Sequence, residues 1–227
     1  MPEQIATLIP NVLRTWAELQ KSFLQTLEMV GTAALVSSFF GVLLGVVLTV
    51  TAPGGLTPSR LAHQVLDKAI NVFRSVPFII MIALLLPLTR IISGTSFGTR
   101  GAIFPLIVGT VPFFARQINS ALMEVDPGMV EAARAMGLPP LAIVWRVYLR
   151  EGLPGMIRGA AITIVNLFAL SAMAGSVGGG GLGDYAIRYG FQRSMVDVTF
   201  VTVAILLALV TLVQSTGSAL ARRLNKN

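Results

Sequence analysis

The residue types that perform most enzyme chemistry are scarce in this chain. There is no cysteine, and His63 is the single histidine. The lack of cysteine excludes disulfides, cysteine-ligated zinc and cysteine nucleophiles, and one histidine cannot build a His-based metal site alone. A membrane enzyme would need a convergent set of nucleophile, base or metal ligands. We therefore expect no catalytic residue, no metal site and no cofactor on this chain, and we expect that it is not an enzyme.

A glycine-rich segment, Gly178 to Gly183, has the composition of a phosphate-binding loop. It lacks the following Lys-Ser/Thr and the strand-to-helix context of such loops, so nucleotide must be handled by another chain. Two interpretations stay open. One is an outer loop, flexible or tightly packed, that touches another protein or lines a gate. The other is a turn that needs positive φ angles.

Charged residues within apolar segments are also candidates for function, because burying a charge in the membrane is energetically costly. Glu28, Arg74 and Arg90 lie close to the ends of predicted spans, where their side chains can snorkel to the interface. The sequence predicts no buried charge pair that marks an ion or proton path. An ion-coupled secondary transporter, the less favoured alternative, would need such a coupling site at mid-membrane.

The segment from Asp126 to Pro140 carries the signals of a short helix. Asp126 suits the N-cap, Pro127 the first helical position, and Gly137 the left-handed position after the last turn. A second short helix is predicted from about Pro140 to Arg150. Its apolar residues are expected on one face, with Arg146 on another: Leu141, Val144, Trp145 and Tyr148.

This predicted elbow has the features of a docking element. The small side chains of Ala132 and Ala133 permit close approach to a cleft, and Glu131 can pair with Arg134 locally or across an interface. The alternative is an ordinary amphipathic loop that rests on lipid headgroups. The residues alone leave both interpretations open.

The composition indicates that these segments are carried by helices in a membrane. Apolar residues make up 54% of the chain and charged residues 12%, with a mean hydropathy of +0.78. Such a chain has too little polar surface for a water-soluble globule, so it is expected in a lipid bilayer. The net charge of +7 is better explained by positive-inside topology than by nucleic acid, and no nucleic-acid partner is expected.

The predicted fold is all-α, a polytopic membrane protein with five transmembrane helices and a structured cytoplasmic loop, for which the family resemblance described below implies a coupling helix. Residues 1–22 are predicted to be an amphipathic N-terminal segment, or simply a short lead-in, and 23–227 the transmembrane domain with the loop at 119–158. Each span needs roughly 20 mainly apolar residues. The expected spans are Leu24–Val50, Ala69–Ile92, Ala102–Ile118, Gly159–Ala174 and Val196–Ser218.

The positive charges predict an orientation. The side that holds 51–68, 116–158 and the C-terminus carries ten Lys or Arg residues, and the opposite side carries six. The N-terminus is therefore predicted outside and the C-terminus inside. A cleavable signal peptide is not expected, because Glu3 interrupts a positive n-region.

The elbow also resembles a known family. The pattern Glu131-Ala132-Ala133-x-x-x-Gly137, followed ten residues later by Val147-Tyr148-Leu149, closely resembles the EAA loop of ABC importer permeases. Segments 71–80, 112–116 and 171–183 make the chain most similar to the permease subunit of methionine importers. The resemblance implies a coupling helix that seats in a groove of an ATPase subunit, with candidate residues Asp126, Glu131, Ala132, Ala133, Arg134 and Gly137.

The same resemblance implies a mechanism and partners. It predicts a pore-forming subunit that works by alternating access, with methionine as the expected cargo and another small amino acid or a quaternary amine as the alternative. Expected partners are a second copy of the chain, two ATPase subunits that bind ATP and Mg, and an external substrate-binding protein or lipoprotein, all at the bacterial inner membrane. The candidate gate or pore residues are Ser171, Met173, Gly178, Gly179, Gly180 and Gly181.

Overall fold

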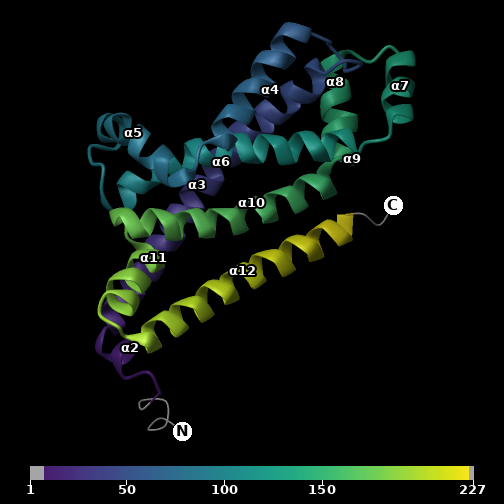
Figure 1. Cartoon of the computed structure of the whole chain (residues 1–227). Coiled ribbons are helices and arrows are strands. Elements are labelled where there is room, and N and C mark those ends of the chain that lie inside the picture. The colour runs from purple at the N-terminus through teal and green to yellow at the C-terminus, as the bar shows by residue number, and fades with distance from the viewer. Residues whose placement is uncertain (1–7, 225–227) are drawn as a thin grey trace. The chain divides into compact units, whose positions relative to one another are not determined.

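The computed structural model describes residues 8–224, and no strand occurs within that range (Figure 1). The N-terminal part contains α2 Pro10–Arg14, α3 Trp16–Thr51, α4 Arg60–Ser75, α5 Phe78–Ser93 and α6 Gly98–Met123. The next helices are α7 Pro127–Ala135, α8 Pro140–Ile143, a π-helical turn Val144–Tyr148 and α9 Leu149–Glu151. The chain continues with α10 Leu153–Ala174, a distorted turn Gly175–Gly179, α11 Gly181–Tyr185, a π-helical turn Ala186–Phe191 and α12 Val196–Leu224.

Four described helices are long and apolar enough to cross a membrane: α3, α6, the segment Leu153–Gly179 and α12. A fifth span is obtained if α4 and α5 together form one broken span. The expected all-α membrane fold is confirmed. The observed helices extend beyond the predicted spans, because each continues through polar residues at its ends.

The predicted span Ala69–Ile92, which carries Pro77 and Pro87, is broken at Pro77. Pro77 has no backbone N–H and disfavours helical conformation in the residue before it. Val76 accordingly adopts an extended conformation, with φ −78° and ψ 123°, and α5 begins only at Phe78. Pro87, in contrast, stays inside α5. The break separates a helix rich in polar residues, α4, from a strongly apolar one, α5.

The chain divides into two compact units. Unit 1 comprises the described parts of 1–34, 77–108 and 164–213. Its main core gathers apolar side chains from α3, α5, α6 and α10: Met29, Val30, Ala33, Phe78, Ala102, Leu106, Leu167, Phe168 and Ala174. A second cluster joins the N-terminal residues to the glycine-rich region through Val12, Leu19, Leu182, Tyr185 and Val198.

The N-terminal residues of unit 1 are held by polar contacts. The Asp197 carboxylate accepts hydrogen bonds from the backbone N–H and the side-chain amide of Asn11, each at 2.9 Å. The Tyr185 hydroxyl lies 2.7 Å from Thr15 Oγ1, and burial raises the pKa of Tyr185 above its usual value. The predicted amphipathic segment thus packs on the protein from residue 8 onward, while Glu3 and Ile5 lie outside the described residues.

Unit 2 comprises 35–76, 109–163 and the described part of 214–227. Here α3 packs closely on α6, because a side chain at Gly45 would lie 2.6 Å from Ile118 Cβ. Small residues such as Gly45 allow helices in a membrane to approach this closely. A separate cluster under the elbow contains Val125, Val130, Ala133 and Ile143.

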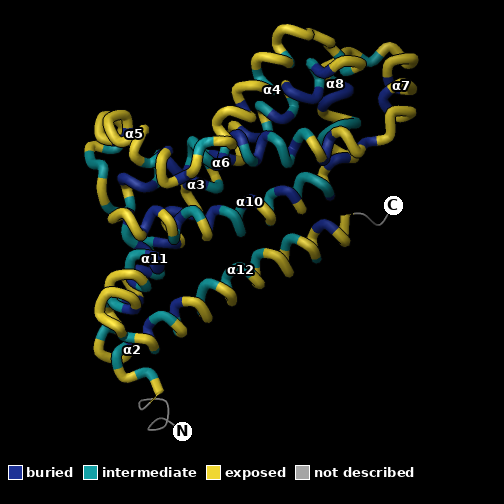
Figure 2. Tube along the Cα trace, viewed as in Figure 1, coloured by how far each residue is buried: buried dark blue, intermediate teal, exposed yellow. Residues whose placement is uncertain are grey.

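Many large apolar residues of the single chain are exposed, and Figure 2 marks the exposed positions along the trace in yellow. In the 18-residue stretch of α12 that qualifies it as a membrane span, only 11% of the residues are buried. In a water-soluble protein such surface would be an aggregation liability, whereas lipid or neighbouring subunits can cover it in a membrane.

Candidate functional site

The predicted elbow helix forms α7, and its first turn is capped as the sequence requires. Asp126 Oδ1 accepts a hydrogen bond of 2.8 Å from the backbone N–H of Gly128. Pro127 occupies the first helical position, where its missing N–H costs nothing. The helix therefore begins where local capping chemistry predicts it.

The end of α7 is a Schellman motif. Gly137 has φ +77°, a left-handed conformation that glycine adopts without steric cost. The Gly137 N–H donates to the Arg134 carbonyl at 2.9 Å, and the Leu138 N–H donates to the Ala133 carbonyl at 3.2 Å. Leu138 also packs against the cluster that contains Ala133. Gly137 thus stops the helix and turns the chain toward α8.

The predicted coupling residues do not all face the same way. Glu131, Ala132 and Arg134 are exposed, whereas Ala133 is only 2% exposed and packs with Val130. Ala133 therefore belongs to the chain's own core and anchors α7. Glu131 and Ala132 present their side chains at the surface of α7.

Arg134 makes a contact that sequence reasoning missed. Its Nη2 donates a hydrogen bond of 2.5 Å to the backbone carbonyl of Gly55, in the turn between α3 and α4. Among the described residues, Arg134 forms no ion pair with Glu131, which was the expected local partner. The elbow is instead attached to the α3–α4 turn.

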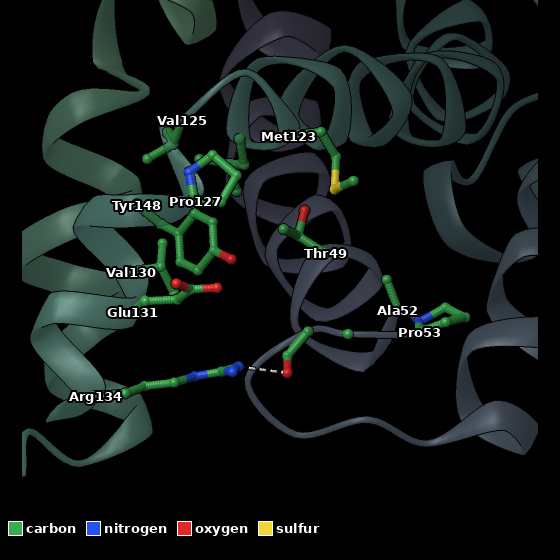
Figure 3. A pocket seen from close by; sticks show the side chains of 13 residues that line it. Thr49, Ala52, Pro53, Met123, Val125, Pro127, Val130, Glu131, Arg134 and Tyr148 are labelled. Carbon is green, nitrogen blue, oxygen red and sulfur yellow. Dashed lines mark hydrogen bonds between the residues drawn. The ribbon is translucent and has the colours of Figure 1, made fainter.

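A small cavity of about 190 Å³ lies beside this contact. Figure 3 shows Glu131, Arg134 and Tyr148 extending from the elbow toward the segment that carries Thr49 and Ala52. The cavity is lined by the α3 end, the α6 end and α7, so three segments distant in sequence meet there.

The second elbow helix is present, but its predicted face is partly wrong. Val144 is buried, whereas Leu141 and Trp145 are 69% and 67% exposed. The π-helical turn Val144–Tyr148 accounts for the exposure of Trp145, because a wider turn rotates the side chains within it away from the regular helical pattern. Leu141 lies before that turn and is exposed as well.

The glycine-rich segment in unit 1 is both a positive-φ turn and a tightly packed one. Gly178, Gly180 and Gly181 have φ of +90°, +76° and +78°. The Gly181 N–H donates to Gln25 Oε1 at 3.0 Å, and the Leu182 N–H donates to Thr26 Oγ1 at 2.8 Å. The turn with positive φ angles is therefore present and is fastened to α3, while contact with another protein or a gate stays a prediction.

The other candidate gate residues differ in exposure. Ser171 is buried, and its hydroxyl donates to the Phe168 carbonyl at 2.8 Å within α10. Met173 is 40% exposed and Gly179 is buried. Of these residues, Met173, Gly178 and the partly exposed Gly180 are the ones that present surface.

A partly exposed charge pair joins α4 and α6 in unit 2. Arg116 Nη2 on α6 lies 2.7 Å from Asp67 Oδ1 on α4, and the two side chains are 26% and 33% exposed. Sequence reasoning missed this pair because 49 residues separate the partners. Elsewhere, no group of three or more His, Cys, Asp or Glu within 8–224 is arranged to hold a metal ion.

Known proteins resemble the chain over nearly its whole length. It is 46% identical over 220 residues to the probable D-methionine transport system permease protein MetI of Vibrio cholerae serotype O1, covering 95% of this chain and 98% of the relative. It is 44% identical over 210 residues to the protein of the same name from Pasteurella multocida, covering 92% and 97%.

A solved structure agrees in fold and sequence. One chain from inward-facing conformations of the MetNI methionine ABC transporter matches with a TM-score of 0.92 and 38% identity, covering 94% of this chain and 99% of that one. The family of binding-protein-dependent transport system inner membrane components matches residues 38–226, which include the elbow and the glycine-rich segment. The chain is therefore a member of this family of inner-membrane permease components.

Proposed function

We propose that this chain is the permease subunit of an ATP-driven methionine importer and works by alternating access. The observation that carries the cargo assignment is the likeness, at 46% identity and near-complete coverage, to a relative named as a D-methionine permease. The solved methionine transporter with a TM-score of 0.92 adds support from structure. Two copies of this chain, two ATPase subunits that bind ATP and Mg, and an external binding protein make up the working assembly.

The elbow is the proposed site where ATP-driven motion enters the permease. Exposed Glu131 and Ala132 face the ATPase, with Asp126 and Gly137 fixing the two ends of α7. Ala133 packs into the apolar cluster with Val130, and Arg134 donates a hydrogen bond to the α3–α4 turn, so both residues hold α7 in place. Motion is transmitted only if α7 docks differently in the two states of the ATPase, because equal docking would shift no equilibrium.

The outer gate is the proposed role of the glycine-rich segment. Its attachment to Gln25 and Thr26 on α3 would transmit helix movement to Gly178–Gly181. In this arrangement the N-terminus lies outside and the C-terminus inside, as the distribution of Lys and Arg favours. Lys226, one of the ten inner positive residues, lies outside the described part of the chain.

Reconstitution tests the cargo. Vesicles that contain this chain and its ATPase, supplied with the binding protein, are expected to accumulate labelled methionine only with ATP. Unlabelled L- and D-methionine are the first competitors to compare, with a quaternary amine as the negative control. ATP-dependent uptake of the quaternary amine without methionine uptake would refute the cargo, and absence of any ATP-dependent uptake by an intact assembly would refute the importer.

A further inference from the structure

A closed polar network lies between α4 and α6 of unit 2. Arg116 Nη2 donates to Asp67 Oδ1 at 2.7 Å and to Asn71 Oδ1 at 3.0 Å. Asn71 Nδ2 in turn donates to Asp67 Oδ2 at 3.1 Å. One cation, one anion and one amide are thus joined in a ring of three hydrogen bonds, next to the apolar cluster of Leu48, Ile70 and Ala115.

The network joins α6, which is long and apolar enough to cross a membrane, to the polar helix α4, which lies on the chain just before the break at Pro77. Arg116 is seven residues before the end of α6 at Met123, which places it about 10 Å along the helix axis from that end. Ionisable side chains at such positions are costly unless they are paired, and they commonly mark the path of a substrate or ion.

Both charged side chains of this pair are partly exposed. The side chains of Arg116 and Asp67 are 26% and 33% exposed, and Asn71 beside them is exposed. Arg116 also keeps unused donor capacity, since its Nε is buried without a hydrogen-bond partner among the described residues. A guanidinium can donate five hydrogen bonds, and Asp67 and Asn71 occupy only two.

We infer that Asp67, Asn71 and Arg116 form a transient binding site for a zwitterionic α-amino acid on its way through the permease. The inference rests on the proposed function and assigns its substrate contact. The carboxylate of the amino acid would take a place at Arg116, and its ammonium group would take a place at Asp67. The ion pair between Asp67 and Arg116 is then replaced by two ion pairs, one from Arg116 to the substrate carboxylate and one from Asp67 to the substrate ammonium. Each charge therefore keeps a partner of opposite sign.

The chemistry fits the ligand class. An α-amino acid carries an ammonium and a carboxylate group on the same carbon atom, and the site offers the opposite charges 2.7 Å apart. The Asn71 amide can accept from the ammonium or donate to the carboxylate. When the substrate leaves, Asp67 and Arg116 pair again, so the site needs no other counter-ion.

The test separates this role from a purely structural one. The double variant Asp67→Asn with Arg116→Gln keeps an amide pair that can hydrogen-bond between α4 and α6 but removes both charges. The matched control is Glu124→Gln with Arg158→Gln, which neutralises an ion pair of the same unit at 3.7 Å, with side chains 70% and 50% exposed. Both assemblies are reconstituted with the ATPase and the methionine-loaded binding protein.

We expect methionine uptake by the Asp67/Arg116 variant to fall at least about tenfold, the factor expected for losing a charge-assisted hydrogen bond. ATP hydrolysis stimulated by the loaded binding protein should stay near the wild-type rate, so less methionine is moved per ATP. The single variant Asp67→Glu, which keeps the charge, should retain most of the uptake. The Glu124/Arg158 control should match wild type in both assays.

Other results overturn the inference. Undiminished uptake by the Asp67/Arg116 variant would show that the charges do not handle substrate. An equal loss of uptake and of stimulated ATP hydrolysis would assign the pair a structural role. If wild type imports no amino acid, the proposed function fails together with the inference; if wild type imports methionine and the neutral pair does so equally well, only the inference fails.

Discussion

At the scale of single residues, the elbow depends on contacts that differ in kind. Asp126 and Gly137 act within α7 through capping, and their roles follow from local chemistry. They were predictable from the sequence for that reason. The bond from Arg134 to the Gly55 carbonyl spans 79 residues and was not predictable, because nothing in the local pattern of either segment specifies the other.

Arg134→Met is expected to loosen the elbow from the α3–α4 turn while leaving α7 folded. The lost hydrogen bond should lower stability by only about 0.5–1.5 kcal/mol. Uptake should decline more than stability, because α7 would move without carrying the turn with it. Uptake and the melting temperature of the purified assembly are the measurements, with exposed Arg146→Met as the matched control. Uptake equal to that of Arg146→Met would contradict the role.

At the scale of elements, the sequence predicted those that obey local rules and missed those that depend on tertiary context. The elbow helix was predicted with its ends, whereas the break at Pro77 was not, because proline is also tolerated inside membrane helices, as Pro87 is here. The exposure of Trp145 was missed because a π-helical turn follows no sequence periodicity.

Gly137→Val should damage the end of α7. A β-branched residue at φ +77° costs about 1–2 kcal/mol, and it would disturb the turn from α7 into α8. Uptake should fall, while Gly137→Asn, which tolerates the left-handed conformation, should retain most of it. Normal uptake by the Val variant would mean that the Schellman motif is dispensable.

Gly181→Ala should disrupt the glycine-rich element. The new Cβ would lie 2.6 Å from Met29 Cε and 2.8 Å from Thr26 Oγ1, and the residue would be held at φ +78°. Gly94→Ala is the control for backbone strain alone, since Gly94 has φ +72° and no atom within 4 Å of the added Cβ. Uptake is expected to fall strongly for Gly181→Ala and only mildly for Gly94→Ala. Equal effects would attribute the loss to strain rather than to packing against α3.

At the scale of the whole molecule, composition and hydropathy were enough to predict an all-α membrane protein, since they reflect the solvent around the chain. Family membership explains why the elbow and the glycine-rich segment coexist in one chain. The Asp67–Arg116 ion pair could not be predicted from the sequence, because pairing between α4 and α6 depends on how the helices pack.

The orientation can be tested with single cysteines, because the natural chain contains none. Ser194→Cys, in the exposed turn before α12, is expected to react with a membrane-impermeant maleimide from outside intact cells. Ala135→Cys, exposed at the end of α7, should react only after the membrane is opened. The reverse pattern of labelling would invert the topology and place the elbow away from any cytoplasmic ATPase.

The central claim is that ATP-driven motion enters this permease through α7, and charge reversal at Glu131 tests it most directly. Methionine uptake and ATP hydrolysis are measured in vesicles for wild type, Glu131→Lys and the exposed control Glu151→Lys. Uptake that is lost with Glu131→Lys, retained with Glu151→Lys and present in wild type only with ATP is the predicted result. Full ATP-dependent uptake by Glu131→Lys would contradict the coupling role of the elbow.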